Sequence, residues 1–127
     1  MAYLWVAIGG ALGSAARYGC TGLMTRWLGT GFPYGTLLVN IVGSYLIGVI
    51  GTLAIAGGRA LSATDLRALL IAGVLGGFTT FSAFSFETFT LARGGNFGGA
   101  AANVLLSLVL CFAAVWLGYV SATAFAR

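Results

Sequence analysis

The sequence predicts an all-α integral membrane protein with four transmembrane helices per subunit, and its composition is the first reason. Of its 127 residues, 60% are hydrophobic and 6% are charged, and the mean hydropathy is +1.04. A soluble domain typically has about 25% charged residues. Six arginines and two acidic residues cannot cover a water-exposed surface. We therefore expect residues 1–127 to form one membrane domain.

The second reason is that four apolar runs each approach the roughly 20 residues that a helix needs to cross the hydrocarbon core. The first run contains Arg17 and begins without a basic segment, so we expect a membrane span rather than a signal peptide. Pro33 precedes the second run, and "SATD" at 62–65 is typical of a helix N-terminus leading into the third. The expected spans are about 3–23, 35–56, 66–91 and 98–125.

Glycine is abundant, with 21 residues, and its placement favours close helix packing. Small residues spaced four apart let two membrane helices approach along their backbones. Such pairs are Gly9 and Gly13, Ser44 and Gly48, and Gly73 and Gly77.

The arginines are evenly divided between the two sides of the membrane. With both termini on one side, that side holds Arg59, Arg67 and Arg127, and the other holds Arg26, Arg93 and Arg17. Orientation follows the imbalance of Lys and Arg between short loops. The sequence therefore predicts weak orientation or insertion in both directions. Scattered arginines also argue against a nucleic-acid-binding patch.

The third run contains an unusual polar segment, "GGFTTFSAFSFE", at 76–87. Gly76 and Gly77 are expected to break the helix near the middle of the membrane, where unwound backbone is tolerated only if buried or facing water. Carbonyls freed at such a break can coordinate a cation. Phe81 and Phe84 are neighbours on one helix face. They are either packing residues or rings whose positive edges attract an anion weakly.

The remaining polar residues inside the spans have alternative roles. Asn40, and the pair Asn103 and Ser107, are expected by default to form hydrogen bonds between helices. Three roles are open for Glu87: a proton site, a salt-bridge partner or a polar group at a pore mouth. Arg17 is its natural partner for an ion pair.

Catalytic constellations are missing from the sequence. It has no histidine, no paired carboxylates and no phosphate-binding GxxxxGK[ST] loop. Cys20 and Cys111 lack the spacing of metal ligands. An enzyme and an ATP-driven pump are therefore not expected. Three functions are left: passive movement of a small solute, exchange coupled to Glu87, and a purely structural role.

Three segments occur in order along the chain: "GGALGSAARY", "PYGTLLVNIVGSYLIG" and "GVLGGFTTFSAFSFE". Together they resemble the Fluc (CrcB) family of bacterial fluoride channels, and the resemblance covers essentially the whole chain. It implies an antiparallel, dual-topology homodimer in the bacterial cytoplasmic (inner) membrane. It also implies two pores for passive fluoride export and a central structural sodium ion.

The resemblance assigns roles residue by residue. The sodium ligands are the backbone carbonyls of Gly76 and Thr79 from each subunit. The pore residues that it implies are Asn40, Phe81, Ser82, Phe84, Glu87 and Ser107, with Arg17 toward the vestibule. The chain departs from the family at Asn103, aligned with a position that is often tyrosine or serine, and at Ala83, where threonine is common.

Two other functions compete with a fluoride channel. A small proton-coupled multidrug exporter has the same size and forms antiparallel dimers, but it relies on a carboxylate in the first span, and the first span here has none. A helper subunit that only assembles with other membrane proteins is the second. The hydroxyl groups clustered near a helix break argue against it.

Overall fold

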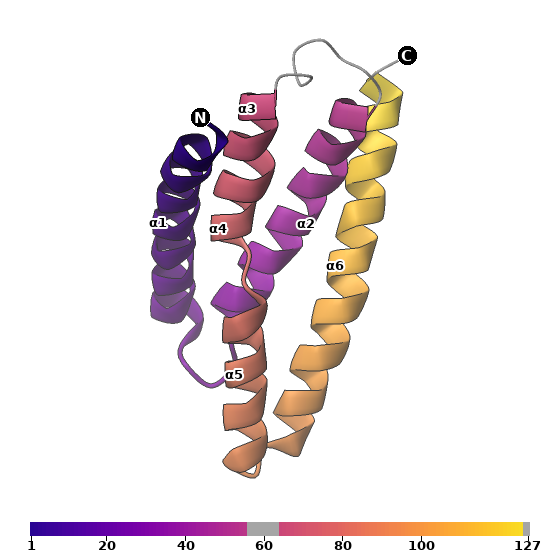
Figure 1. Cartoon of the computed structure of the whole chain (residues 1–127). Coiled ribbons are helices and arrows are strands. Elements are labelled where there is room, and N and C mark those ends of the chain that lie inside the picture. Colours follow the sequence, from indigo (N-terminus) through magenta and orange to yellow (C-terminus); the bar gives the residue numbers. More distant parts are fainter. Residues whose placement is uncertain (56–63, 126–127) are drawn as a thin grey trace.

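A computed structural model of the protein describes residues 1–55 and 64–125, and this part of the chain is helical without β-strands. Arg59 and Arg127 of the charge comparison, residue 56 of the second expected span, and positions 62–63 of the expected helix start lie outside the described residues. The helices, in chain order (Figure 1), are α1 (Ala2–Leu28), α2 (Tyr34–Ile55), α3 (Thr64–Arg67), η2 (Ala68–Leu75), α4 (Gly76–Phe78), α5 (Phe81–Arg93) and α6 (Phe97–Phe125). The all-α prediction is confirmed.

Three helical segments of the described chain are long and apolar enough to cross a membrane. They are α2, the composite segment Thr64–Arg93 and α6. The 27 residues of α1 have a length of about 40 Å, but Arg17 and several glycines lower its hydropathy. Composition therefore marks three spans, and the expected fourth depends on the length of α1.

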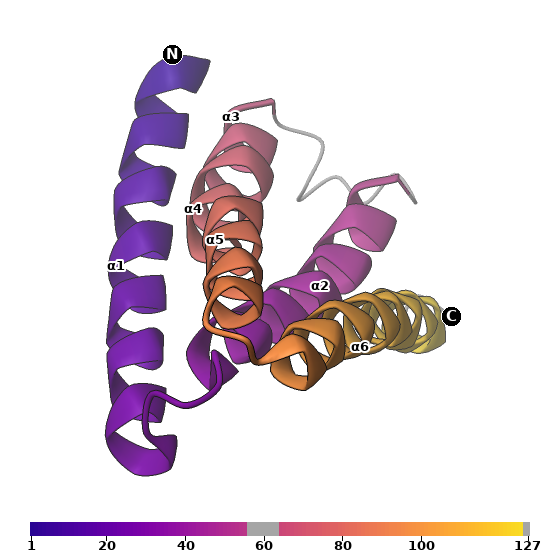
Figure 2. The same cartoon turned by 90° about the horizontal axis from the view of Figure 1, so that it is seen from below.

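The helices form two packed groups. Helix α1 lies along η2 and α4, and α2 lies along α6. Viewed from the end, α3, α4 and α5 follow one another beside α1, and α2 and α6 lie on the other side (Figure 2). The start of α1 and the end of α6 are at the same end of the bundle (Figure 1).

Glycine brings these helices into backbone contact. A Cβ atom on Gly9 would come within 2.9 Å of the Gly73 Cα, and one on Gly77 would come within 2.6 Å of the Gly10 carbonyl oxygen. Gly48 and Gly118 approach each other in the same way between α2 and α6. The close packing predicted from the small-residue pairs is confirmed at these glycines.

The third span is interrupted at Thr79 and Thr80, which adopt extended backbone angles (φ −81°, ψ 155° and φ −152°, ψ 116°). The prediction that Gly76 and Gly77 break the helix is wrong. Both lie in a helical turn, with φ −62° and ψ −37° at Gly76. Gly77 is needed because α1 leaves no room for a side chain, not because the backbone unwinds there.

Candidate ion pathway at the helix break

Asn40 on α2 pairs with the extended backbone of Thr80. Its Nδ2 donates to the Thr80 carbonyl at 3.1 Å, and its Oδ1 accepts from the Thr80 N–H at 2.8 Å. The two bonds together fix the orientation of the amide, because only one orientation offers both a donor and an acceptor. The predicted hydrogen bond from Asn40 to another helical segment is confirmed. One N–H of its amide remains for another partner.

Several backbone carbonyls lose their usual helical donors at this break, and those of Gly76 and Thr79 are among them. In a continuous helix the Thr80 N–H would donate to the Gly76 carbonyl, and the Ala83 N–H to the Thr79 carbonyl. Here the Thr80 N–H donates to Asn40, and the Ala83 N–H donates to Thr80 Oγ1 at 3.2 Å. This second bond is an N-terminal cap and explains why the helix resumes at Phe81. Both carbonyls are therefore available to a ligand.

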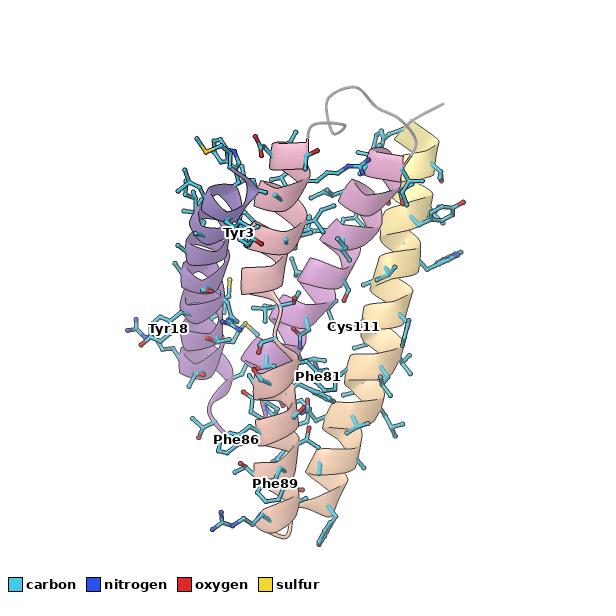
Figure 3. The ribbon with its side chains drawn as sticks, viewed as in Figure 1. Tyr3, Tyr18, Phe81, Phe86, Phe89 and Cys111 are labelled. Carbon is cyan, nitrogen blue, oxygen red and sulfur yellow. The ribbon has the colours of Figure 1, made fainter. Side chains whose placement is uncertain are left out.

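A cavity of about 450 Å³ lies beside the break, between η2, α2, α5 and α6. It contains the aromatic pair Phe81 and Phe84, with ring centroids 5.3 Å apart and ring planes tilted by 52°. Ser107 is 8% exposed, and its Oγ has no hydrogen-bond partner among the described residues. Phe81 on α5 and Cys111 on α6 both line this cavity, and Figure 3 labels both residues in the region between the two helices. The cavity is lined by residues 40, 43, 44, 47, 71, 75, 79, 80, 81, 84, 107, 108, 111, 112 and 115.

A second cavity, of about 280 Å³, lies between α5, the C-terminal part of α1 and the start of α2. Threonines line much of it, and Glu87 is its acidic residue. Thr36 Oγ1 donates to Glu87 Oε1 at 2.7 Å, whereas Glu87 Oε2 is buried and has no partner in the described chain. Glu87 thus lies in a different cavity from the two phenylalanines.

The other predicted site residues lie outside both linings. Gly76 is exposed on the single subunit. Ser82 Oγ is 3.2 Å from Thr80 Oγ1, at the edge of the break. Within the described residues Arg17 forms no ion pair with Glu87, whose one hydrogen bond is to Thr36. The structure therefore assembles Asn40, Thr79, Phe81, Phe84 and Ser107, and separates them from Glu87.

Comparison with known proteins gives this geometry a context. Residues 4–119 match the CrcB-like protein family, described as Camphor Resistance (CrcB). A protein of Opitutus terrae named "Fluoride-specific ion channel FluC" is 52% identical over 120 residues, covering 94% of this chain and 91% of the relative. A protein with the same name from Rhodospirillum rubrum is 52% identical over 122 residues, covering 96% and 95%. The chain belongs to the CrcB family.

Membership of the CrcB family settles the broad class of the protein. A third relative, from Methylocella silvestris, carries the same channel name and is 48% identical over 124 residues, covering 98% of this chain and 95% of the relative. The family transports ions and is not a family of enzymes, as the sequence predicted. The apolar helices of this chain and the bacterial origin of its relatives confirm that it is a multi-pass bacterial membrane protein.

Two threonines of the CrcB family site, Thr88 and Thr36, are not among the residues that the sequence predicts. Asn103 is 1% exposed, and its Nδ2 donates to Thr88 Oγ1 at 2.9 Å; Thr88 in turn donates to the Phe84 carbonyl at 2.7 Å. The predicted interhelical bond of Asn103 is confirmed, but the one expected of Ser107 is absent from the described residues. Thr36 lies four residues before Asn40 on the same helix face, and that spacing was an available signal for its role.

Proposed function

We propose that the protein is a passive, fluoride-selective channel through which cytoplasmic fluoride leaves the cell. In this proposal α1 is the fourth span, and two subunits assemble as an antiparallel homodimer with two pores. The names of the relatives support fluoride as the permeant ion. The structural observation that carries the proposal is the cavity in which Phe81 and Phe84 meet the Asn40 amide and the Ser107 hydroxyl.

The chemistry of this cavity suits a small, strongly hydrated anion. Removing water from fluoride requires replacement donors, and the free N–H of Asn40 and the hydroxyl of Ser107 are candidates. The edges of aromatic rings carry partial positive charge and add a weaker attraction. Several weak sites in series allow an ion to enter and also to leave. Phe81 and Phe84 are therefore proposed as pore residues rather than as packing residues.

The second cavity is the proposed continuation of the pathway toward one membrane face. Its threonine hydroxyls are donors, and Glu87 is held by Thr36 at its wall. We assign Glu87 to the pore mouth, with Ser82 at the edge of the break between the cavities and Arg17 toward the vestibule.

The exposure of the first cavity supports a dimer. Phe81 is 77% exposed on the single subunit, although a conducting pathway has to be shielded from lipid. A second subunit packed against this surface would supply the missing wall. The even distribution of arginines in the sequence agrees with two subunits of opposite orientation.

Sodium is the proposed structural cation. The carbonyls of Gly76 and Thr79 fit it, because both have lost their helical donors and neutral oxygens are suitable ligands for a hard cation. When bound, the ion would supply a fixed positive charge that holds the two broken helices together. Gly76 is exposed on the single subunit, so its carbonyl lies where a partner subunit could contribute the same pair.

A flux measurement tests this function. The purified protein is reconstituted into liposomes loaded with either fluoride or chloride, without ATP, with valinomycin and K⁺ to balance charge and a protonophore to remove any proton gradient. Fluoride is expected to leave rapidly, and chloride is expected to stay. Equal rates for the two ions would contradict selectivity. Fluoride flux that requires an imposed proton gradient would instead favour the proton-coupled exporter.

A further inference from the structure

We infer that Asn40 is a positioning residue that keeps the helix break open and so exposes the Gly76 carbonyl to a cation. This role is distinct from lining the cavity. It rests on the proposed sodium site, and it links the cavity wall to that site through one side chain.

Regular helical hydrogen bonding ends at Thr79. The Thr79 N–H still donates to the Leu75 carbonyl at 3.0 Å, in regular helical fashion. The Thr80 N–H is the first that does not donate to the carbonyl four residues earlier, and it donates instead to Asn40 Oδ1. Asn40 therefore takes the donor that would otherwise bond the Gly76 carbonyl.

Thr80 is 8% exposed, so water is a poor substitute partner for its N–H, and a buried N–H seeks another acceptor. Without Asn40 Oδ1, the nearest regular acceptor is the Gly76 carbonyl, four residues back. Extending the helix by this one bond would occupy the carbonyl and close the break.

The donor half of the Asn40 amide binds the same residue. Its Nδ2 holds the Thr80 carbonyl, so one side chain satisfies both backbone groups of the extended residue, as a neighbouring β-strand would. These two hydrogen bonds keep Thr80 Oγ1 in position to accept from the Ala83 N–H. Asn40 thereby also keeps the Thr79 carbonyl outside the helix that follows.

The test uses the sodium dependence of stability, which a residue that only lines a pore would not change. The intact purified protein is heated in detergent over a series of Na⁺ concentrations, with N-methyl-D-glucamine replacing Na⁺ at constant ionic strength. The variants are Asn40→Ala, which removes both bonds, and Asn40→Ser, whose shorter side chain has one hydroxyl oxygen where the amide has separate donor and acceptor atoms. Ser107→Ala is the control, because Ser107 lines the same cavity without bonding to the break.

The Na⁺ concentration that gives half of the stabilisation is expected to rise by about tenfold or more in Asn40→Ala, since the loss of one hydrogen bond corresponds to roughly that factor. Asn40→Ser is expected to lie between wild type and Asn40→Ala, and it provides the comparison if Asn40→Ala does not fold. Ser107→Ala should stay close to wild type even if its fluoride flux falls.

The outcomes separate this inference from the proposed function. Unchanged Na⁺ half-points in the folded Asn40 variants would overturn the inference. A wild-type protein that conducts fluoride, but whose thermal stability does not depend on Na⁺, would also overturn the inference. It would not contradict the channel proposal. A wild-type protein that is stabilised by Na⁺ in an Asn40-dependent manner but conducts no fluoride would support the inference and contradict the channel.

Discussion

At the scale of single residues, the tilted pair Phe81 and Phe84 brings ring edges into a cavity that also holds polar groups. Replacement of either residue by isoleucine keeps the hydrophobicity but removes the electropositive edge. We expect Phe81→Ile and Phe84→Ile each to lower fluoride efflux severalfold, up to about tenfold, because an aromatic contact contributes about 0.5–1.5 kcal/mol. The measurement is efflux from liposomes with a fluoride electrode.

Phe78 provides the control for these two substitutions. It precedes the break and is absent from the cavity lining, although its ring is near Gly43. Phe78→Ile should therefore preserve efflux better than either pore substitution. Wild-type efflux from Phe81→Ile and Phe84→Ile, with dimers intact by size-exclusion chromatography, would make both rings packing residues.

Asn103 connects α6 to α5 through its hydrogen bond to Thr88. Asn103→Ala leaves the half-buried Thr88 hydroxyl without its donor, and loss of such a bond costs about 1–2 kcal/mol. We expect a lower thermal stability of the purified protein, followed by circular dichroism. Thr123→Ala is the control, because Thr123 bonds only within its own helix. An equal loss of thermal stability in both variants would show that the hydrogen bond from α6 to α5 does not contribute more to stability than a bond within one helix.

At the scale of helices, the contact between α1 and the first half of the third span depends on glycine. A methyl group on Gly77 would meet the Gly10 carbonyl oxygen and the Gly10 Cα, and neither backbone atom can rotate away. We expect Gly77→Ala to destabilise the protein by about 1–3 kcal/mol, the usual cost of overpacking. Gly19→Ala, with open space around it, is the matched control. The measurement is the thermal unfolding midpoint followed by circular dichroism. Equal midpoints for both variants would contradict the packing role of Gly77.

The helices themselves could be predicted from the sequence because long apolar runs dominate the signal. The break was placed too early, at Gly76 and Gly77, because glycine is an intrinsically poor helix former in water. Contact with α1 overrides that tendency at Gly77. The actual break depends on Asn40, which is 40 residues away from Thr80 along the chain. No local pattern contains that information.

The site was predictable to a similar extent. The motif around Phe81 and Phe84 identified a cluster that the structure assembles with Asn40 and Ser107. The spacing of Thr36 and Asn40 marks Thr36 as a polar residue on the same helix face, but it does not identify Glu87 as its partner, because the two residues are 51 positions apart on different helices. The ion pair of Glu87 with Arg17, one of the roles left open by the sequence, was suggested only by the opposite charges of two residues inside the predicted spans.

At the scale of the whole molecule, the even division of arginines predicts two orientations in the membrane. A compartment-sensitive reporter fused to the C-terminus should give signal on both sides of the membrane, because neither side has an excess of positive charge. Adding two lysines next to the C-terminus should shift the signal to one side and reduce fluoride efflux, since antiparallel pairs would become rare. A one-sided signal from the unmodified protein would contradict dual topology.

The start of α1 and the end of α6 share one end of the bundle, and this limits how two copies could be joined in a single gene. A short flexible linker from the first copy to the second would return the chain to the membrane from the same side, so both copies would point the same way. A tandem protein with opposed halves requires a linker that itself crosses the bilayer, once or any odd number of times. A concatemer built with one added apolar helix should therefore restore fluoride resistance, whereas its counterpart with a hydrophilic linker should restore it only by pairing with a second polypeptide.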